Sequence, residues 1–240
     1  MPDKYIYLII DLACISIPFA FSFHPRLGFR KQWKYFFPAC LGTAIVFLVW
    51  DYFFVRGNVW SFNSRYITGV YLFGLPLEEC LFFICVPYAC MFTYHAITLF
   101  FKSSRYIQAA NYFSWCLVAF LVVSGVLNIG RLYTSVTFLL LAVFLVVLLV
   151  RRVSFLPQFY MTFAIILVPF FVSNGLLTGT GLAEPVVRYN DNFNTGIRLL
   201  TIPFEDTFYG MLLILMNVTG FVYLGGSEVA VPVEGNAVAD

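Results

Sequence analysis

Charged side chains are scarce in this 240-residue chain: 11% of its residues are Asp, Glu, Lys or Arg, whereas 61% are hydrophobic. A soluble domain carries about 25% charged residues. Nucleotide-binding motifs are missing as well, because neither GxGxxG nor GxxxxGK[ST] occurs in the sequence. These absences exclude an ordinary soluble domain and leave no segment that binds a nucleotide or dinucleotide.

Metal-binding patterns and lysines are also in short supply. The six cysteines form no CxxC pair and have no histidine at ligand spacing, so we expect no metal site and interpret them as packing residues. The four lysines, Lys4, Lys31, Lys34 and Lys102, lie between apolar runs or at their ends. A retinal-binding photoreceptor needs a lysine amine inside a span for its Schiff base. The sequence therefore argues against that class of protein.

Long apolar runs are what the chain has in abundance. Runs close to the ~20 residues that span a hydrocarbon core recur seven times. They are Tyr5–Phe23, Tyr35–Val55, Leu75–Phe101, Ala109–Leu127, Tyr133–Val150, Gln158–Leu177 and Ile202–Leu224. This pattern predicts an all-α polytopic membrane protein of about seven transmembrane helices, with the first run retained as a signal anchor. We expect the polar tail, residues 227–240, to be disordered.

The positive charges predict how the chain is oriented in the cell membrane. Eight of the fourteen Lys and Arg residues lie in the loops after the first, third and fifth runs, and six lie on the opposite side. By the positive-inside rule, the N-terminus is non-cytoplasmic and the C-terminus is cytoplasmic. The net charge of +2 is scattered between the runs, so we expect no nucleic-acid partner.

An internal repeat becomes visible when the chain is shifted by 127 positions. NSRYITGVYLFGLPLEE, residues 63–79, then aligns without gaps on NDNFNTGIRLLTIPFED, residues 190–206. The identical pairs include Asn63/Asn190, Thr68/Thr195, Gly69/Gly196, Pro76/Pro203 and Glu78/Glu205. Four membrane crossings separate the two segments, so both would begin helices that run in the same direction.

This duplication predicts two parallel repeats about a pseudo-twofold axis along the membrane normal. The first repeat would be residues 1–106, with three helices, and the second would be residues 131–226, also with three helices. A connector helix at residues 107–130 would join them. Two like elements would then approach one face of the membrane.

Each repeated segment ends in a pair of acids at the predicted start of a helix. The pairs are Glu78 with Glu79 and Glu205 with Asp206, each behind a proline that suits helix entry (Pro76, Pro203) and a loop glycine (Gly69, Gly196). Such acids can simply interact with the positive end of the helix dipole. Near a membrane span they are also functional candidates, as a general acid and a general base. Neighbours on a helix point about 100° apart, and we expect Glu78 and Glu205, the identical members, to face the site.

Aromatic residues make up 20% of the chain, and many of them flank the acid motifs. Single rings fit an interfacial belt, but acids and rings together predict a pocket that protonates an apolar molecule and shields the carbocation. The residues that we expect to bind substrate are Trp50, Asp51, Trp60, Tyr71, Phe82, Asn174 and Tyr209. Asp51 and Asn174 are counterparts in the repeat. Asp11, inside the first run, either bonds to a neighbouring helix in its protonated form or belongs to the pocket.

The motifs LPLEECLFF and IPFEDTFYG resemble the PxE[ED] signature of the membrane-integral lycopene cyclases. In that family the actinobacterial type uses two small subunits, and the archaeal and fungal type has both halves fused. This chain is similar to the fused form over residues 3–225, including VWDYFFVRGNVWSF and NGLLTG. Fungal relatives carry a phytoene synthase domain behind the cyclase domain. Because this chain stops after the seventh run, we expect that activity to be absent.

The resemblance implies a reaction that suits these residues. A carboxylic acid protonates the terminal double bond at the ψ-end of lycopene, the ring closes through a tertiary cation, and a base removes a proton to leave a β-ionone ring. By this resemblance, Glu78, Glu79, Glu205 and Asp206 form the acid/base set of an isomerase that needs no cofactor. The expected partners are a linear carotenoid from the bilayer, membrane lipid and other enzymes of the carotenoid pathway. A carotenoid hydratase on the same scaffold and a membrane carrier with intramembrane acids remain alternatives.

Overall fold

Seven long α-helices dominate the computed structural model, which describes residues 3–101 and 106–226. The helices are α1 (Ile6–Phe21), α2 (Trp33–Arg56), α3 (Leu77–Phe100), α4 (Ile107–Leu127), α5 (Leu132–Val150), α6 (Leu156–Leu177) and α7 (Phe204–Tyr223). Short 3-10 helices precede the first two, at Asp3–Tyr5 and Phe29–Gln32. All seven helices are long and apolar enough to cross a membrane, and their ends lie within two residues of the predicted runs. The predicted all-α polytopic fold is confirmed, while the predicted disordered tail and the loop charges Lys102 and Arg105 lie outside the described residues.

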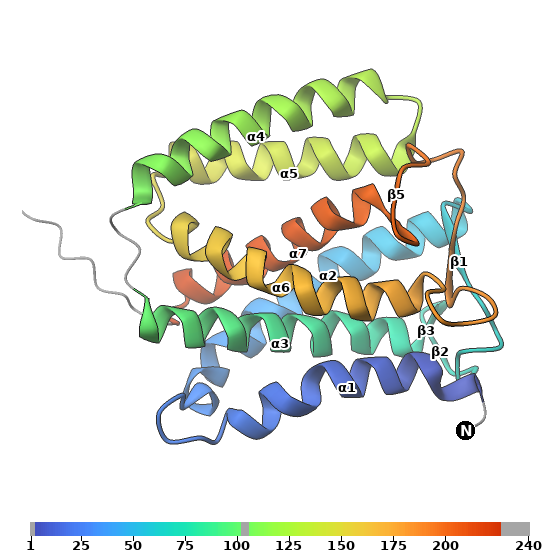
Figure 1. The fold of residues 1–240 in the computed structure, drawn as a ribbon, viewed down its shortest axis with the longest axis horizontal. Helices are drawn as coiled ribbons and strands as arrows, with labels where there is room; N and C mark the ends of the chain where they lie inside the picture. Colours follow the sequence, from blue (N-terminus) through green and yellow to red (C-terminus); the bar gives the residue numbers. More distant parts are fainter. Residues whose placement is uncertain (1–2, 102–105, 227–240) are drawn as a thin grey trace, which may run out of the picture.

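Short strands replace part of the loops that the sequence predicts before the acid motifs. They are β1 (Trp60–Phe62), β2 (Tyr71–Leu72), β3 (Leu75–Pro76), β4 (Val187–Tyr189), β5 (Arg198–Leu199) and β6 (Ile202–Pro203). β2 and β3 form a hairpin that leads into α3, and β5 and β6 form a hairpin that leads into α7. Figure 1 shows that α3 and α7 both begin at the end of the molecule where the strands gather.

The strand pair β1–β4 joins the two halves of the chain. Its antiparallel register places Ser61 opposite Arg188, two residues that are 127 positions apart and therefore equivalent in the repeat. Trp60 pairs with Tyr189, and Phe62 pairs with Val187. An antiparallel pair of equivalent strands centred on equivalent residues is the arrangement that a twofold relation generates.

The repeated asparagines hold the two halves together in the same way. The Asn63 amide donates to the Pro185 carbonyl at 3.2 Å, and the Asn190 amide donates to the Asn58 carbonyl at 3.2 Å. Asn58 and Pro185 are themselves 127 positions apart. The identity at this position therefore has a structural reason, since each asparagine satisfies a loop carbonyl of the other half.

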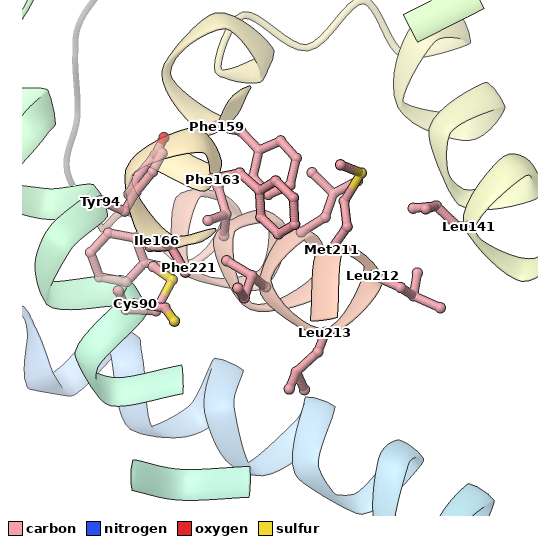
Figure 2. Close-up of a cluster of buried hydrophobic side chains, with 14 of the residues drawn as sticks. Cys90, Tyr94, Leu141, Phe159, Phe163, Ile166, Met211, Leu212, Leu213 and Phe221 are labelled. Atoms are coloured by element: carbon pink, nitrogen blue, oxygen red, sulfur yellow. The ribbon is translucent and has the colours of Figure 1, made fainter. Parts of the chain in front are cut away.

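A helical core lies between α3, α6 and α7. Cys90 and Tyr94 of α3, Phe159, Phe163 and Ile166 of α6, and Met211, Leu213 and Phe221 of α7 belong to one buried cluster. Figure 2 shows Met211 beside Phe163, with Leu213 on the opposite side of α7. The rings of Phe159 and Phe163 stack with centroids 5.8 Å apart. Lipid tails are as apolar as these side chains, so close packing rather than exclusion from water distinguishes this core.

One glycine sets the spacing between α2 and α7. A Cβ atom at Gly220 would lie 3.0 Å from the Cβ atom of Ala39, closer than side chains normally pack. Small residues at a crossing point let membrane helices approach closely and gain van der Waals contact. α7 is thereby held against α2, which fixes the position of the acid motif at its other end.

Candidate active site

A cavity of about 360 Å³ lies among α1, α3, α6, α7 and the β1–β4 pair. Its wall follows one face of α3 through Glu79, Phe82, Val86, Ala89, Cys90 and Thr93. These residues recur at helical spacing over 14 positions, which corresponds to about 21 Å along a helix axis. The cavity is therefore elongated, apolar along most of its length, and closed at one end by acids and aromatic rings.

The cavity also reaches the outer surface of the helices. Its wall includes Ala13 and Ile17 of α1 and Pro169 of α6, and all three are exposed, Ile17 to 68%. Figure 1 shows α1 and α6 on either side of α3. An apolar molecule dissolved in a surrounding bilayer would thus meet an opening between α1 and α6 at mid-helix height.

The first acid of each pair points away from this cavity and holds the preceding loop. Glu78 accepts a hydrogen bond from the Thr68 backbone N–H at 2.7 Å, and Glu205 accepts one from the Thr195 N–H at 2.7 Å. Both carboxyl groups are fully buried, and neither lines the cavity. The expectation that Glu78 and Glu205 face the site is therefore wrong.

The loop geometry explains why these two acids are identical in the repeat. Gly69 and Gly196, which follow the two threonines, have φ angles of 87° and 75°, a conformation that glycine adopts without steric cost. This bend presents the threonine N–H groups to the helix start. Pro76 and Pro203 stand just before the helices, at the N-cap, rather than inside the first turn.

The second acid of the first motif, Glu79, faces the cavity beside another carboxyl group. Tyr7 donates its hydroxyl to Glu79 Oε2 at 2.5 Å. The side chain of Asp51, from α2, meets the Glu79 carboxyl group. Both acids line the cavity and both are buried.

The second acid of the second motif, Asp206, faces the same cavity among neutral donors. Tyr133 donates to Asp206 Oδ1 at 2.5 Å. Asn174 and Tyr189 donate to Oδ2 at 2.8 and 2.9 Å. Removal of the Tyr189 side chain from bulk solvent, followed in importance by the Asp206 charge, raises the pKa of the Tyr189 phenol well above its usual value. The phenol therefore stays protonated and donates to the carboxylate.

Aromatic rings enclose the acid end of the cavity. The Trp60 centroid lies 5.2 Å from that of Tyr133, 5.9 Å from that of Tyr189 and 6.2 Å from that of Tyr209. All four rings line the cavity. Ring faces stabilise a positive charge that lies among them, most strongly where water is excluded. This end of the cavity can thus stabilise a carbocation next to the carboxyl groups of Asp51, Glu79 and Asp206.

Most of the predicted substrate-binding residues lie on this wall, but two do not. Asp51, Trp60, Phe82, Asn174 and Tyr209 line the cavity. Trp50 lies behind it, with its ring 5.1 Å from that of Tyr209. Tyr71 is 54% exposed on strand β2, so its prediction as a binding residue is wrong. It belongs to an exposed hairpin that precedes α3.

Asp11 fits neither reading that the sequence left open. It is fully buried in α1, one turn from Tyr7, but it does not line the cavity. Among the residues that the structure describes, neither of its carboxyl oxygens has a hydrogen-bond partner. The acid lies behind the Glu79 side of the site rather than in it.

Sequence reasoning missed three tyrosines that bind the cavity acids: Tyr7, Tyr133 and Tyr189. Tyr7 and Tyr133 occupy the first turns of α1 and α5, and their backbone N–H groups bond to the carbonyls of the equivalent residues Tyr66 and Phe193. They lie 126 positions apart, one short of the repeat spacing. Extending the comparison of the halves upstream to YIYLIID and RLYTSVT would have revealed them.

The chain matches one protein family over both halves. The sequence model described as lycopene cyclase matches residues 4–97 and 130–224, which cover α1, α2, most of α3 and α5–α7 and leave α4 out. No solved structure matches the chain.

Two curated relatives match shorter segments. The bifunctional lycopene cyclase/phytoene synthase of Podospora anserina is 30% identical over 79 residues, which are 33% of this chain and 13% of that protein. The protein of the same description from Leptosphaeria maculans is 35% identical over 46 residues, which are 19% of this chain and 8% of that protein. The aligned segments span only a small part of either relative. Since the family match covers most of both halves, the chain belongs to the lycopene cyclase family.

Proposed function

We propose that this protein is a lycopene cyclase that converts the ψ-ends of lycopene to β-ionone rings. The observation that carries this proposal is the elongated apolar cavity that ends at three carboxyl groups, those of Asp51, Glu79 and Asp206, and four aromatic rings. A linear polyene fits such a shape with one end against the acids and the rest along α3. Its route in from the bilayer is the opening between α1 and α6.

The chemistry follows from the groups at the closed end. A carboxylic acid adds a proton to the terminal double bond, which forms a tertiary cation. The next double bond attacks this cation to close the ring, and a carboxylate removes a proton from the ring. No electrons are gained or lost, so the enzyme is an isomerase of the intramolecular lyase type. Glu79 and Asp206 perform the proton transfers, while Glu78 and Glu205 hold the loops that position them.

The protein would work as a multi-pass protein of the cell membrane. With a non-cytoplasmic N-terminus, the strands and both acid motifs lie toward the outer face, and the apolar groove extends toward the cytoplasmic face. Both acids share one cavity, so each binding event would cyclise one end of the substrate. A bicyclic product then requires the monocyclic intermediate to leave and return with its other end.

Expression in a bacterial host that accumulates lycopene tests this proposal. The parent protein should produce carotenoids with β-rings and unchanged mass, separated by chromatography and identified by mass spectrometry. Glu79→Gln should abolish the product at equal protein level, whereas Glu184→Gln, which changes an exposed loop acid of the same type, should retain it. Addition of one water to the product would indicate a hydratase. Unaltered lycopene with well-expressed parent protein would contradict both enzymes and leave the carrier.

A further inference from the structure

The two cavity acids occupy equivalent places in the repeat but have different neighbours. Glu79 meets a second carboxyl group, that of Asp51 on α2. Asp206 meets the amide of Asn174 on α6, which donates to it at 2.8 Å. We propose that the Asp51–Glu79 pair delivers the proton to the substrate, and that Asp206 is the carboxylate that removes a proton after ring closure. This assignment rests on the proposed cyclase function.

The first half of the site is built to store a proton. Asp51 and Glu79 are 1% and 7% exposed, and their carboxyl groups adjoin. Two carboxyl groups in contact at a buried site cannot both be ionised, because their charges repel each other. Such a pair therefore holds one proton between them. Oδ2 of Asp51 has no hydrogen-bond partner among the described residues, which leaves it able to carry that proton. Both groups line the cavity and can therefore reach a bound alkene.

The second half of the site is built to retain a charge. Asp206 receives hydrogen bonds from three neutral donors, the hydroxyl groups of Tyr133 and Tyr189 and the amide of Asn174. Hydrogen bonds donated to a carboxylate stabilise its ionised form. An ionised Asp206 also stabilises the cation that forms beside it. Asn174 has no acidic proton to share, so the pair Asn174–Asp206 does not store one.

The proton balance closes within the cavity. The O–H bond of the Asp51–Glu79 pair breaks, and a C–H bond forms at the terminal double bond. Ring closure moves the positive charge to the carbon that Asp206 faces in this assignment, and Asp206 takes the proton from the neighbouring ring carbon. The proton then returns from Asp206 to the Asp51–Glu79 pair across the shared cavity. No proton or electron is consumed overall.

Deuterium incorporation from heavy water separates the two roles. Purified protein is incubated with lycopene in D₂O, and both the product and the recovered lycopene are analysed by mass spectrometry. In Asp206→Asn, ring formation should fall about 100-fold, but the recovered lycopene should still gain deuterium, since the cation can return a proton to Glu79. In Glu79→Gln and Asp51→Asn, both ring formation and deuterium uptake should fall at least tenfold below the Asp206→Asn level.

Asn174→Asp makes the reverse exchange of Asp51→Asn at the counterpart position in the other half, where it places a carboxyl group beside Asp206 instead of removing one beside Glu79. In Asn174→Asp the recovered lycopene should still gain deuterium, whereas in Asp51→Asn this gain should be lost. Lycopene binding, followed by its visible absorption, verifies that each variant is folded. If Asp206→Asn does not fold, Tyr189→Phe should lower ring formation about tenfold with deuterium uptake unchanged.

The outcomes distinguish this assignment from the function on which it rests. Deuterium uptake in Glu79→Gln but not in Asp206→Asn would reverse the two roles. Equal loss in Asp51→Asn and Asn174→Asp would show that the asymmetry has no catalytic effect. In both cases a parent protein that forms β-rings keeps the cyclase function intact. A parent protein that leaves lycopene unaltered would overturn the function itself.

Discussion

In the first half of the chain Glu78 accepts the Thr68 N–H at 2.7 Å, and in the second half Glu205 accepts the Thr195 N–H at the same distance. One residue further on, the halves differ: Glu79 adjoins a carboxyl group, whereas Asp206 is surrounded by hydroxyl and amide donors. The duplicated halves thus agree where an acid holds the loop and differ where an acid faces the cavity. The two acids of a pair can have these different roles, one bonded to the loop and one facing the cavity, because adjacent residues of a helix point in different directions.

The two halves can also be compared at the ends of α3 and α7 that lie far from the acid motifs. Substitutions there should have the largest effect, which is on stability. Thr93 and Gly220 are equivalent in the repeat, but Thr93 lines the cavity while Gly220 packs against Ala39. Gly220→Leu should destabilise the protein by about 1–3 kcal/mol because it overpacks the crossing of α2 and α7. Thr93→Leu should leave stability nearly unchanged and weaken lycopene binding, because it fills the groove. Thermal unfolding in detergent and titration with lycopene measure the two effects.

Equal losses of stability in the two variants would contradict this division between packing and groove. Gly42, on α2, is a suitable control, since among the described residues no atom outside its own stretch of helix lies within 4 Å of the Cβ that a substitution there would add. Gly42→Leu should therefore unfold close to the parent temperature.

A smaller effect is expected for the tyrosines that donate to the cavity acids. Tyr7→Phe removes the phenol that bonds to Glu79, and this bond strengthens as Glu79 loses its proton in the transition state. A hydrogen bond to a charged group contributes about 1.5–3 kcal/mol, so kcat should fall about 10- to 100-fold. Tyr133→Phe leaves Asp206 with the donors Tyr189 and Asn174, and its kcat should fall about tenfold or less. Steady-state kinetics with lycopene in detergent compares them.

A larger loss in Tyr133→Phe than in Tyr7→Phe would indicate that Asp206, rather than Glu79, gains charge in the transition state. The two variants are matched, because each removes one phenolic hydroxyl that donates at 2.5 Å.

The smallest effect is expected at the loops that join the halves. Glu184 accepts hydrogen bonds from Asn63 at 2.7 Å and from Arg188 at 2.6 Å, which hold the pKa of its carboxyl group below its usual value. At the 127-residue shift, Gly57 takes the place of Glu184, so this position of the first half offers Asn190 no carboxyl group. Glu184→Gln should lower Tm slightly at neutral pH. Since a lowered pKa contributes stability that is lost as pH falls through it, the difference from the parent should vanish in acid.

Thermal unfolding of parent and variant at several pH values measures this contribution. A difference that grows toward acid pH would contradict the sign of the effect and the ion pair behind it.

The sequence was sufficient for much of the fold because the bilayer imposes simple rules. Each span needs about 20 apolar residues with its backbone hydrogen bonds satisfied internally. Seven runs therefore predicted seven helices to within two residues. The shifted alignment also predicted equivalent helix starts at Glu78 and Glu205. It did not reveal β1 and β4, because these two strands pair with each other across more than 120 residues.

The site was harder to predict, for reasons that particular residues illustrate. The identity of Glu78 and Glu205 suggested shared chemistry, but it reflects the shared need to hold a Thr–Gly bend. Asp206 and Glu79 are different amino acids in different environments. A comparison of the two halves that looks for identical residues therefore gives this position too little weight. Tyr71 lies close to the motif in sequence but on an exposed hairpin, whereas Tyr7 is distant in sequence and bonds to Glu79.

Composition and periodicity alone determined that this chain forms apolar helices, and the sequence alone showed that its two halves share one motif, since both properties are local and can be compared along the chain. Only the tertiary structure decided which acids meet, because contact between Asp51 and Glu79, or among Tyr133, Tyr189 and Asp206, requires helices and strands far apart in the chain to converge on one cavity. The proton chemistry depends on those neighbours, and no spacing in the sequence encodes them.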